Sequence, residues 1–222
     1  LQVVAQSSSG QLSSENTAKP LTLAFVSADF DDRDHPTLLL SFAVLESLVL
    51  LSRQESLRAS DQPAIDVHVF VVGSDPNCKP HPLLNTLFES DRNRLHVLKL
   101  KDSDATCANQ ICAAGIDVLV DMGGPTSRSR PGIFAKRPAP FQGHWLAFPG
   151  TYGVSPVTSM MQFAIADQYV EPEDTRGNSQ GGSLILLPCY QPTSCWRIHA
   201  LEGGDSERPT SFQLPPQPAA AG

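Results

Sequence analysis

Short apolar runs, nearly unbroken by polar residues, recur along this chain and constrain its fold more than any other feature. The clearest are LTLAFVSAD (Leu21–Asp29), IDVHVFVVG (Ile65–Gly73) and Ile116–Val120. A strand with one wet face alternates apolar and polar residues, whereas a continuously apolar strand is covered on both faces, as in a parallel sheet. The runs therefore predict a parallel sheet with helices on both sides.

Segments with helical periodicity separate these runs. Thr37–Leu57 carries apolar residues at helical spacing, and Leu83–Glu89 and Asp104–Ala114 predict shorter helices. In the last of these, Asp104 is the expected N-cap and Gly115 the expected C′ residue. Further strands are predicted at Arg94–Lys101, Phe141–Phe148, Phe163–Val170 and Leu184–Leu187. This alternation predicts an α/β fold with a Rossmann-like, doubly wound, mostly parallel sheet and right-handed crossovers.

The two ends of the chain differ in composition from its centre. Residues 1–19 are rich in Ser, Gln and Asn and carry no apolar period, which predicts a disordered linker. Residues 198–222 are dense in Pro, Gly and Ala and predict a disordered tail. Residues 20–197 are the expected Rossmann-like lobe.

Charge and cysteine usage exclude several classes of protein. The net charge of −7 argues against a nucleic-acid-binding protein, which normally presents a basic face. The five cysteines lack the spacing of zinc or redox motifs, which favours thiols in a reducing compartment. No signal peptide is visible, and the apolar run Leu38–Leu51 is interrupted by polar residues and short for a bilayer. We expect a soluble protein of the cytoplasm or nucleus, with no membrane partner.

Three loops follow predicted strands at the edge where open α/β sheets bind ligands: Asp29–Thr37, Asp121–Arg130 and Pro149–Gly153. The first contains His35, which exchanges a proton near neutral pH, followed by Pro36 at the expected start of a helix. Asp31, Asp32 and Asp34 of this loop are expected to be solvated rather than to bind metal. An exposed His35 without any function is the competing interpretation.

The other two loops contain glycines that let a ligand approach the backbone. They are Gly123-Gly124-Pro125-Thr126 and Gly150-Thr151-Tyr152-Gly153, and either is also compatible with an ordinary tight turn. The chain has neither the G-x-G-x-x-G fingerprint of dinucleotide binding nor a P-loop.

The remaining histidines and two aspartates have simpler explanations. His96 and His144 lie in predicted strands, where packing is the better interpretation, and Asp66 and Asp117 precede strands at the opposite edge and are expected to be structural. A receiver-like signalling domain, with acidic residues after the first strand holding Mg²⁺, would need a lysine at the end of a late strand. Phe141–Phe148 provides none.

Three longer segments resemble the catalytic region of protein O-GlcNAc transferases, including the plant SPINDLY-type relatives. They are VSADFDDRDHPT, GIDVLVDMGGPTSRSR and FAKRPAPFQGHWLAFPGTYG, and the later LLPCYQP fits the closing strand and loop of that family. The resemblance covers about residues 21 to 197. It implies the N-terminal lobe of a two-lobed GT-B glycosyltransferase.

Such an enzyme transfers N-acetylglucosamine from UDP-GlcNAc to Ser or Thr of proteins, inverting the anomeric centre, with neither metal nor cofactor. In the SPINDLY branch the sugar is fucose. The resemblance further implies tetratricopeptide repeats and a second catalytic lobe as partners in the intact protein. We therefore expect a fragment that is inactive alone; a non-catalytic binding or scaffolding fragment is the alternative.

The resemblance also assigns site residues. His35 matches the His-Pro histidine proposed as a base or orienting group, and it is our candidate catalytic residue. The implied substrate-binding residues are Pro36, Thr37, His96, Gly124, Thr126, Pro149, Gly150 and Thr151. The match departs from the family at Leu38, where a second histidine is common, and at Pro125, where an aromatic residue is common.

Overall fold

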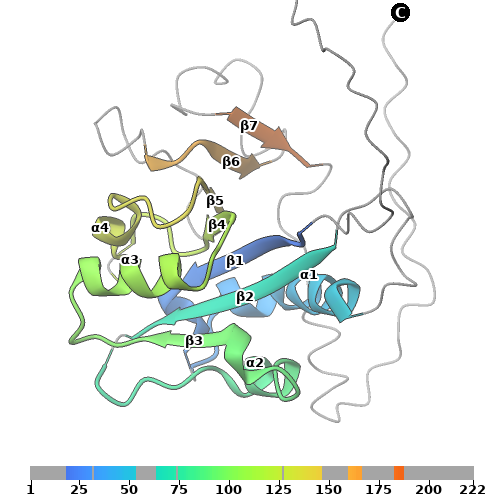
Figure 1. The fold of residues 1–222 in the computed structure, drawn as a ribbon. Coiled ribbons are helices and arrows are strands. Elements are labelled where there is room, and N and C mark those ends of the chain that lie inside the picture. Colours follow the sequence, from blue (N-terminus) through green and yellow to red (C-terminus); the bar gives the residue numbers. More distant parts are fainter. Residues whose placement is uncertain are drawn as a thin grey trace, which may run out of the picture.

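A parallel sheet forms the centre of the computed structural model, which describes residues 19–31, 33–53, 64–73, 75–126, 128–146, 160–166 and 183–187. Its seven strands are all parallel and follow the order β3-β2-β1-β4-β5-β6-β7 (Figure 1). The strands are β1 (Leu21–Ser27), β2 (Ile65–Val72), β3 (Leu95–Leu98), β4 (Val118–Asp121), β5 (Phe141–Trp145), β6 (Phe163–Ala166) and β7 (Ser183–Leu186). The predicted fold class is confirmed.

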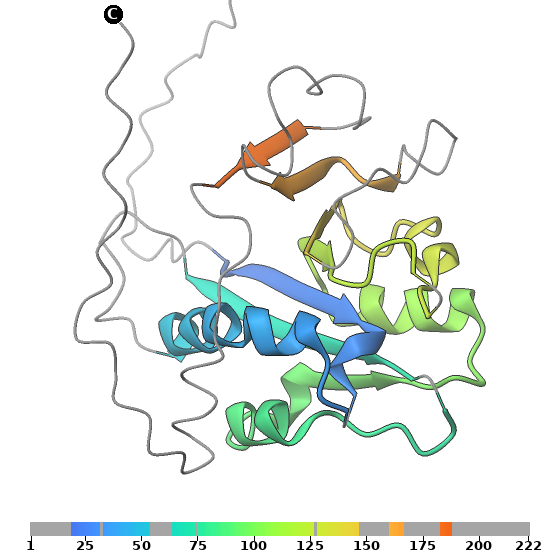
Figure 2. The same cartoon turned by 180° about the vertical axis from the view of Figure 1, so that it is seen from behind.

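Helices cover both faces of the sheet. The α-helices are α1 (Pro36–Arg53), α2 (Pro82–Leu87), α3 (Asp104–Ala113) and α4 (Pro131–Phe134), and short 3-10 turns occupy η1 (Ala28–Phe30) and η3 (Arg92–Arg94). Helices α3 and α4 lie on the face turned to the viewer in Figure 1, and α1 lies on the opposite face, seen in Figure 2. The molecule therefore has the layers that the apolar strands predict.

The two faces bury separate apolar cores. Phe25 of β1 and Val69 of β2 pack with α1 and α2, whereas the next residues, Val26 and Phe70, pack with α3 and α4. All four side chains are at most 3% exposed. Because neighbouring residues of a strand point to opposite faces, both cores require apolar residues at successive positions. This requirement explains why β1 and β2 lack polar alternation.

Helix α1 belongs to the first core although it is long and apolar. By length and composition alone, its 18 residues with mean hydropathy 1.5 would also suit a membrane-crossing helix. Its Leu38, Phe42, Leu45 and Val49 side chains are buried in the core shared with the sheet. The helical spacing of these four residues in the sequence is thus explained by packing on the sheet.

Three local predictions are corrected. Ser103, not Asp104, is the N-cap of α3: its Oγ accepts a hydrogen bond from the backbone N–H of Thr106 at 3.1 Å, and Asp104 lies in the first turn. Asp66 lies within β2 rather than before it. Strand β5 ends at Trp145 because Leu146 adopts φ +61°, which breaks the extended backbone. The prediction of Gly115 as the C′ residue is confirmed, with φ +68° after the cap at Ala114.

A pair of histidines lies on the β2–β3 boundary. The Nδ1 of His68 and the Nε2 of His96 are 3.0 Å apart, and the His96 ring stacks on Phe70 with 4.3 Å between ring centroids. Burial lowers the pKa of His68, and burial together with the neighbouring His68 lowers the pKa of His96 to about 4. Both rings are therefore neutral at neutral pH, and one of the two facing nitrogens donates its N–H to the other.

Because the folded protein takes up these protons less readily than the unfolded chain, its stability should fall in acid. The loss should begin as the pH drops below 6.5, the ordinary pKa of histidine, and continue toward pH 4. His96→Gln keeps a hydrogen-bonding partner for His68 but does not titrate. We expect its free energy of unfolding, measured by urea denaturation, to fall by about 1–2 kcal/mol less than that of the wild type over this range. If the free energy of unfolding falls equally with pH in the wild type and in His96→Gln, the acid sensitivity does not come from His96.

Candidate active site

The strand order itself locates the candidate site. From β1 the chain proceeds outward to β2 and β3, then crosses to β4 and proceeds in the other direction. Strands β1 and β4 are therefore neighbours at the point where the winding reverses, with Val26 beside Asp121. In open α/β sheets a crevice forms beyond the carboxyl ends of these two strands, between the loops that follow them. Here those loops are residues 28–35 and 122–130.

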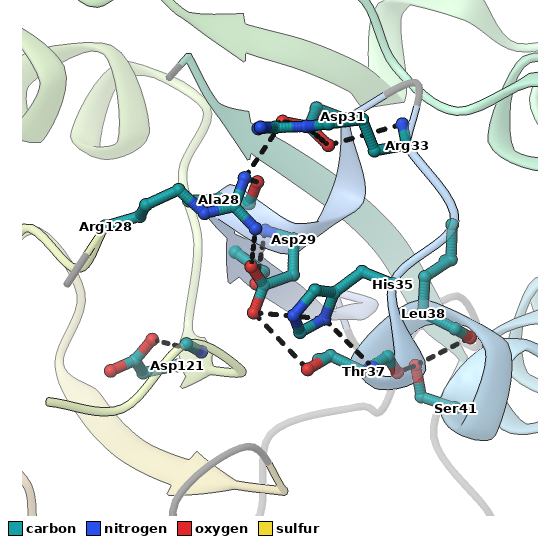
Figure 3. Close-up of polar contacts among 12 residues, drawn as sticks. Ala28, Asp29, Asp31, Arg33, His35, Thr37, Leu38, Ser41, Asp121 and Arg128 are labelled. Atoms are coloured by element: carbon teal, nitrogen blue, oxygen red, sulfur yellow. Dashed lines mark hydrogen bonds and ion pairs between the residues drawn. The ribbon is translucent and has the colours of Figure 1, made fainter. Parts of the chain in front are cut away.

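His35 and Asp29 form a dyad in the first loop (Figure 3). The Nδ1 of His35 lies 3.5 Å from Oδ2 of Asp29, which also accepts a hydrogen bond from Thr37 Oγ1 at 3.3 Å. The Asp29 side chain is 7% exposed and that of His35 is 38% exposed. The dyad therefore joins a buried carboxylate to an imidazole that solvent and ligands can reach.

Two groups compete for Nδ1 of His35. The backbone N–H of Thr37 points at this nitrogen from 3.3 Å and suits the tautomer that carries its proton on Nε2. The Asp29 carboxylate suits the other tautomer, in which Nδ1 carries the proton and Nε2 has a free lone pair. Only the second tautomer can accept a proton at Nε2. Asp29 therefore favours the form of His35 that acts as a base.

Arginine side chains compensate the buried carboxylates of this loop. Arg128, from the loop after β4, contacts Asp29 Oδ1 through Nη2 and lies 3.1 Å from Asp31 Oδ2 through Nη1. Arg33 approaches both oxygens of Asp31, with its Nε at 3.1 and 3.0 Å. Asp31 is 1% exposed, so the prediction that it is solvated is wrong. Asp34, with a 79% exposed side chain, fits that prediction, and Asp32 lies outside the described residues.

The segment before α2 fixes the position of this loop. His81 donates its backbone N–H to Phe30 O at 3.0 Å, its Nε2 lies 3.0 Å from Asp34 Oδ1, and a single antiparallel bridge joins Asp31 to Pro80. His81 also caps α2, because its Nδ1 accepts the N–H of Leu83 at 3.2 Å. The first loop is thus attached to a helix as well as to β1.

Asp121 organises the glycine loop after β4. Its Oδ1 accepts the backbone N–H of Gly123 at 2.9 Å, and Gly124 adopts φ +57°, a conformation that glycine tolerates best. Burial raises the pKa of Asp121 to about 7; the charge of Asp29 adds to this shift, and the N–H groups of Gly123 and Gly124 oppose it. A carboxyl group that changes charge near neutral pH therefore holds the loop beside the dyad.

Comparison with known proteins identifies the family. The model of glycosyl transferase family 41 matches residues 10–180. The chain belongs to this family. One solved relative, described as the K341M mutant of the O-GlcNAc transferase from Thermobaculum terrenum, superposes with a TM-score of 0.55 and 26% identity over 78% of this chain and 29% of that one.

Two curated relatives match shorter segments of this chain. The chain is 37% identical over 82 residues to a protein from Arabidopsis thaliana named as the probable UDP-N-acetylglucosamine–peptide N-acetylglucosaminyltransferase SPINDLY. It is 40% identical over 65 residues to the UDP-N-acetylglucosamine–peptide N-acetylglucosaminyltransferase of Caenorhabditis elegans. These matches cover 35% and 29% of this chain but only 8% and 5% of the relatives.

Five of the predicted site residues of this family 41 chain lie on the two segments that follow β1 and β4. His35 and Thr37 contact Asp29 as described, Pro36 is the first residue of α1, and Thr126 donates its N–H to Gly124 O at 2.8 Å in the glycine loop. The predicted residues Pro149, Gly150 and Thr151 lie outside the described residues.

His96 occupies a different position. It lies within β3, and its contacts are with His68 and Phe70 on the face covered by α3 and α4. The structure thus places it among side chains of the sheet, as the packing interpretation expects. Its role in substrate binding stays a prediction from the resemblance. Across the described residues, no three His, Cys, Asp or Glu side chains are grouped so that they could hold a metal ion.

Sequence reasoning overlooked three members of the site: Asp29, Asp121 and Arg128. Asp29 and Asp121 carried a usable signal, because each is an acidic residue at or just beyond the end of an apolar strand. Arg128 carried none. Its partners lie 99 and 97 residues earlier in the chain, and only the pairing of β1 with β4 brings them together.

Proposed function

We propose that this chain forms the lobe of a protein O-GlcNAc transferase that holds the acceptor hydroxyl and the donor sugar. The observation that carries the proposal is the His35–Asp29 dyad at the β1–β4 crevice of a family 41 chain. The proposed donor is UDP-GlcNAc, and the acceptor is a Ser or Thr side chain of a protein. The Caenorhabditis elegans and Thermobaculum terrenum relatives are named for the transfer of N-acetylglucosamine, which supports this sugar, and the similarity to SPINDLY keeps fucose as the alternative.

In the proposed reaction the acceptor oxygen attacks the anomeric carbon, and the bond from that carbon to the diphosphate oxygen breaks as UDP leaves. The hydroxyl proton goes to Nε2 of His35 while Nδ1–H points to Asp29. The resulting imidazolium is stabilised by the Asp29 carboxylate, 3.5 Å away. Attack on the face opposite the leaving group inverts the anomeric centre. As in the family resemblance, no metal or cofactor takes part.

The glycine loop suits a sugar hydroxyl. Gly124 has no Cβ, so its backbone permits close approach, and the exposed Thr126 offers a hydroxyl that donates or accepts. Pro149, Gly150 and Thr151 are proposed to contact the donor sugar on the strength of the resemblance alone. Fixed groups of this kind accelerate transfer chiefly by positioning the reactants.

The proposal divides the work between two lobes. The matched region covers 29% of the solved relative, and we propose that a second lobe supplies most contacts to the nucleotide. On this view the chain alone binds UDP-GlcNAc weakly and transfers no sugar. A purely binding or scaffolding role is less well supported, because it leaves the His35–Asp29 dyad without a function.

A domain exchange tests the proposal. The 222-residue chain is assayed alone and in place of the matched region of the Thermobaculum terrenum enzyme, with UDP-GlcNAc and an acceptor protein. We expect glycosylated acceptor, detected by mass spectrometry, from the exchanged protein only, and the same product in the presence of EDTA. Circular dichroism and the thermal midpoint establish that the exchanged protein is folded. A folded exchanged protein that binds UDP-GlcNAc but yields no product would overturn the assignment of the catalytic base to this lobe.

A further inference from the structure

A second hollow lies at the carboxyl edge of the sheet, outside the β1–β4 crevice. It has a volume of about 540 Å³ and is formed by the segment after β2 and the segment after β3. Its apolar lining includes Val97, Leu100 and Cys78, and its charged lining includes Lys99 and Lys101. No residue of the His35–Asp29 dyad or of the glycine loop lines it.

The chemistry of the hollow differs from that of the rest of the chain. Leu100 is 48% exposed, one of the most exposed large apolar side chains among the described residues. Two exposed ammonium groups flank it in a protein whose net charge is −7. The one carboxylate of the lining, Asp75, turns back to accept the N–H of Asn77 at 2.7 Å. The hollow therefore offers apolar contact together with positive charge.

Close backbone packing joins the two segments that form this hollow. Gly73 donates its N–H to Leu98 O at 2.7 Å where β2 and β3 end. A Cβ at Gly73 would lie 2.9 Å from Leu98 O and 3.0 Å from Leu100 N, closer than real side chains approach a backbone. Only glycine therefore allows the two segments to meet in this way, and the hollow is formed without a ligand.

The hollow is also joined to the candidate site. The segment that contributes Asp75 and Cys78 continues into Pro80 and His81, the two residues that bind the loop carrying the dyad. A polypeptide lying across this segment runs from the hollow toward His35 along a single edge of the sheet. A small molecule held in the hollow would not extend to the candidate site, so the connection between the two favours a polypeptide ligand.

We propose that this hollow binds the acceptor polypeptide, through an apolar side chain of the acceptor flanked by acidic residues. The apolar side chain packs against Leu100 and Val97, and the carboxylates pair with Lys99 and Lys101. The proposal rests on the proposed function, because it assigns an acceptor sequence preference to the same enzyme. It predicts that acceptor hydroxyls lie near acidic and apolar residues in the substrate sequence.

Peptide binding to the 222-residue chain tests the proposal without any need for transfer. Fluorescence anisotropy compares three labelled peptides that share a serine and differ in a neighbouring triplet: Asp-Phe-Asp, Lys-Phe-Lys or Asp-Ser-Asp. We expect the Asp-Phe-Asp peptide to bind about tenfold more tightly than either of the others, because Lys-Phe-Lys replaces two attractions with two repulsions and Asp-Ser-Asp loses the apolar contact. Equal affinities would overturn the proposal.

Two surface variants locate the binding. Lys99→Glu with Lys101→Glu should weaken the Asp-Phe-Asp peptide about tenfold and reverse the preference toward Lys-Phe-Lys, and Leu100→Ser should abolish the advantage of phenylalanine. Lys136→Glu is the matched control, because Lys136 is exposed near α4 and lies outside the hollow. If both hollow variants bind the Asp-Phe-Asp peptide as tightly as the wild type, the peptide binds elsewhere. The same holds if UDP-GlcNAc displaces the peptide from the two hollow variants but not from the wild type.

Failure of this proposal is distinguishable from failure of the proposed function. In the exchanged protein, the Lys99→Glu, Lys101→Glu pair should raise KM for the Asp-Phe-Asp peptide about tenfold and leave kcat unchanged. An exchanged protein that transfers sugar with the same KM before and after this double substitution refutes the hollow and keeps the transferase. An exchanged protein that binds the peptide at the hollow but transfers no sugar refutes the proposed transferase function and keeps the hollow as a peptide-binding site.

Discussion

His35→Ala should lower the rate of sugar transfer by on the order of 10²-fold or more in the exchanged protein, with little change in donor affinity. Removing the imidazole removes the proton acceptor, while the backbone and glycine loop that hold the sugar stay in place. The His35 side chain is 38% exposed, so its loss should leave the fold intact. Single-turnover rates and UDP-GlcNAc binding, measured on the same preparation, separate the two effects.

The pH profile distinguishes a base from a group that merely orients the acceptor. With His35 as base, the pH dependence of the wild-type rate should differ from that of the residual His35→Ala rate, whereas an orienting group should leave the two profiles parallel. Asp29→Asn should give an intermediate loss, because it keeps the ring but no longer favours the proton on Nδ1. Ser47→Ala, an exposed position on α1, is the control. Turnover that His35→Ala leaves unchanged would remove His35 from the mechanism.

The sequence is sufficient to predict the edge of the sheet on which these residues lie. Unbroken apolar strands such as Ile65–Gly73 imply a parallel sheet, and in a parallel sheet every carboxyl end lies at one edge. The sequence therefore predicts the edge on which His35 lies without any knowledge of the strand order. The neighbour of β1 was not predictable, because adjacency of β1 and β4 depends on where the chain reverses its direction of winding.

Charge compensation was likewise beyond sequence reasoning. The acidic segment DFDDRDHP predicts that Asp31 is solvated, because acidic residues are almost always exposed. It is buried because Arg33 curls back onto it and Arg128 reaches it from the loop after β4. The N-cap of α3 was mispredicted for a related reason. Serine and aspartate are both good N-caps, and the adjacent candidates Ser103 and Asp104 differ only in the path of the backbone before the helix.

Arg128→Met should destabilise the folded protein by about 2 kcal/mol, because it leaves the buried Asp29 carboxylate without its guanidinium partner. Loss of a fully buried partner costs more, but the Arg128 side chain is 28% exposed and water screens part of the interaction. Asp31 also loses its contact with Arg128 but keeps its contacts with Arg33, so we expect Asp29 to account for most of the effect. Urea denaturation measures the loss, and the thermal midpoint should fall by roughly 4–8 °C.

The double variant Arg128→Met, Asp29→Asn identifies the source of this loss. If the unpaired carboxylate is responsible, neutralising it should restore at least about half of the stability that Arg128→Met removes. Arg92→Met is the matched control: Arg92 is exposed and its side chain bonds Asn85 Oδ1 at 2.9 Å, so its replacement should change stability by less than about 0.5 kcal/mol. Strictly additive losses in the double variant would show that Arg128 acts through packing. Coupled losses would instead establish that the guanidinium partner of the buried Asp29 carboxylate is supplied by the loop after β4.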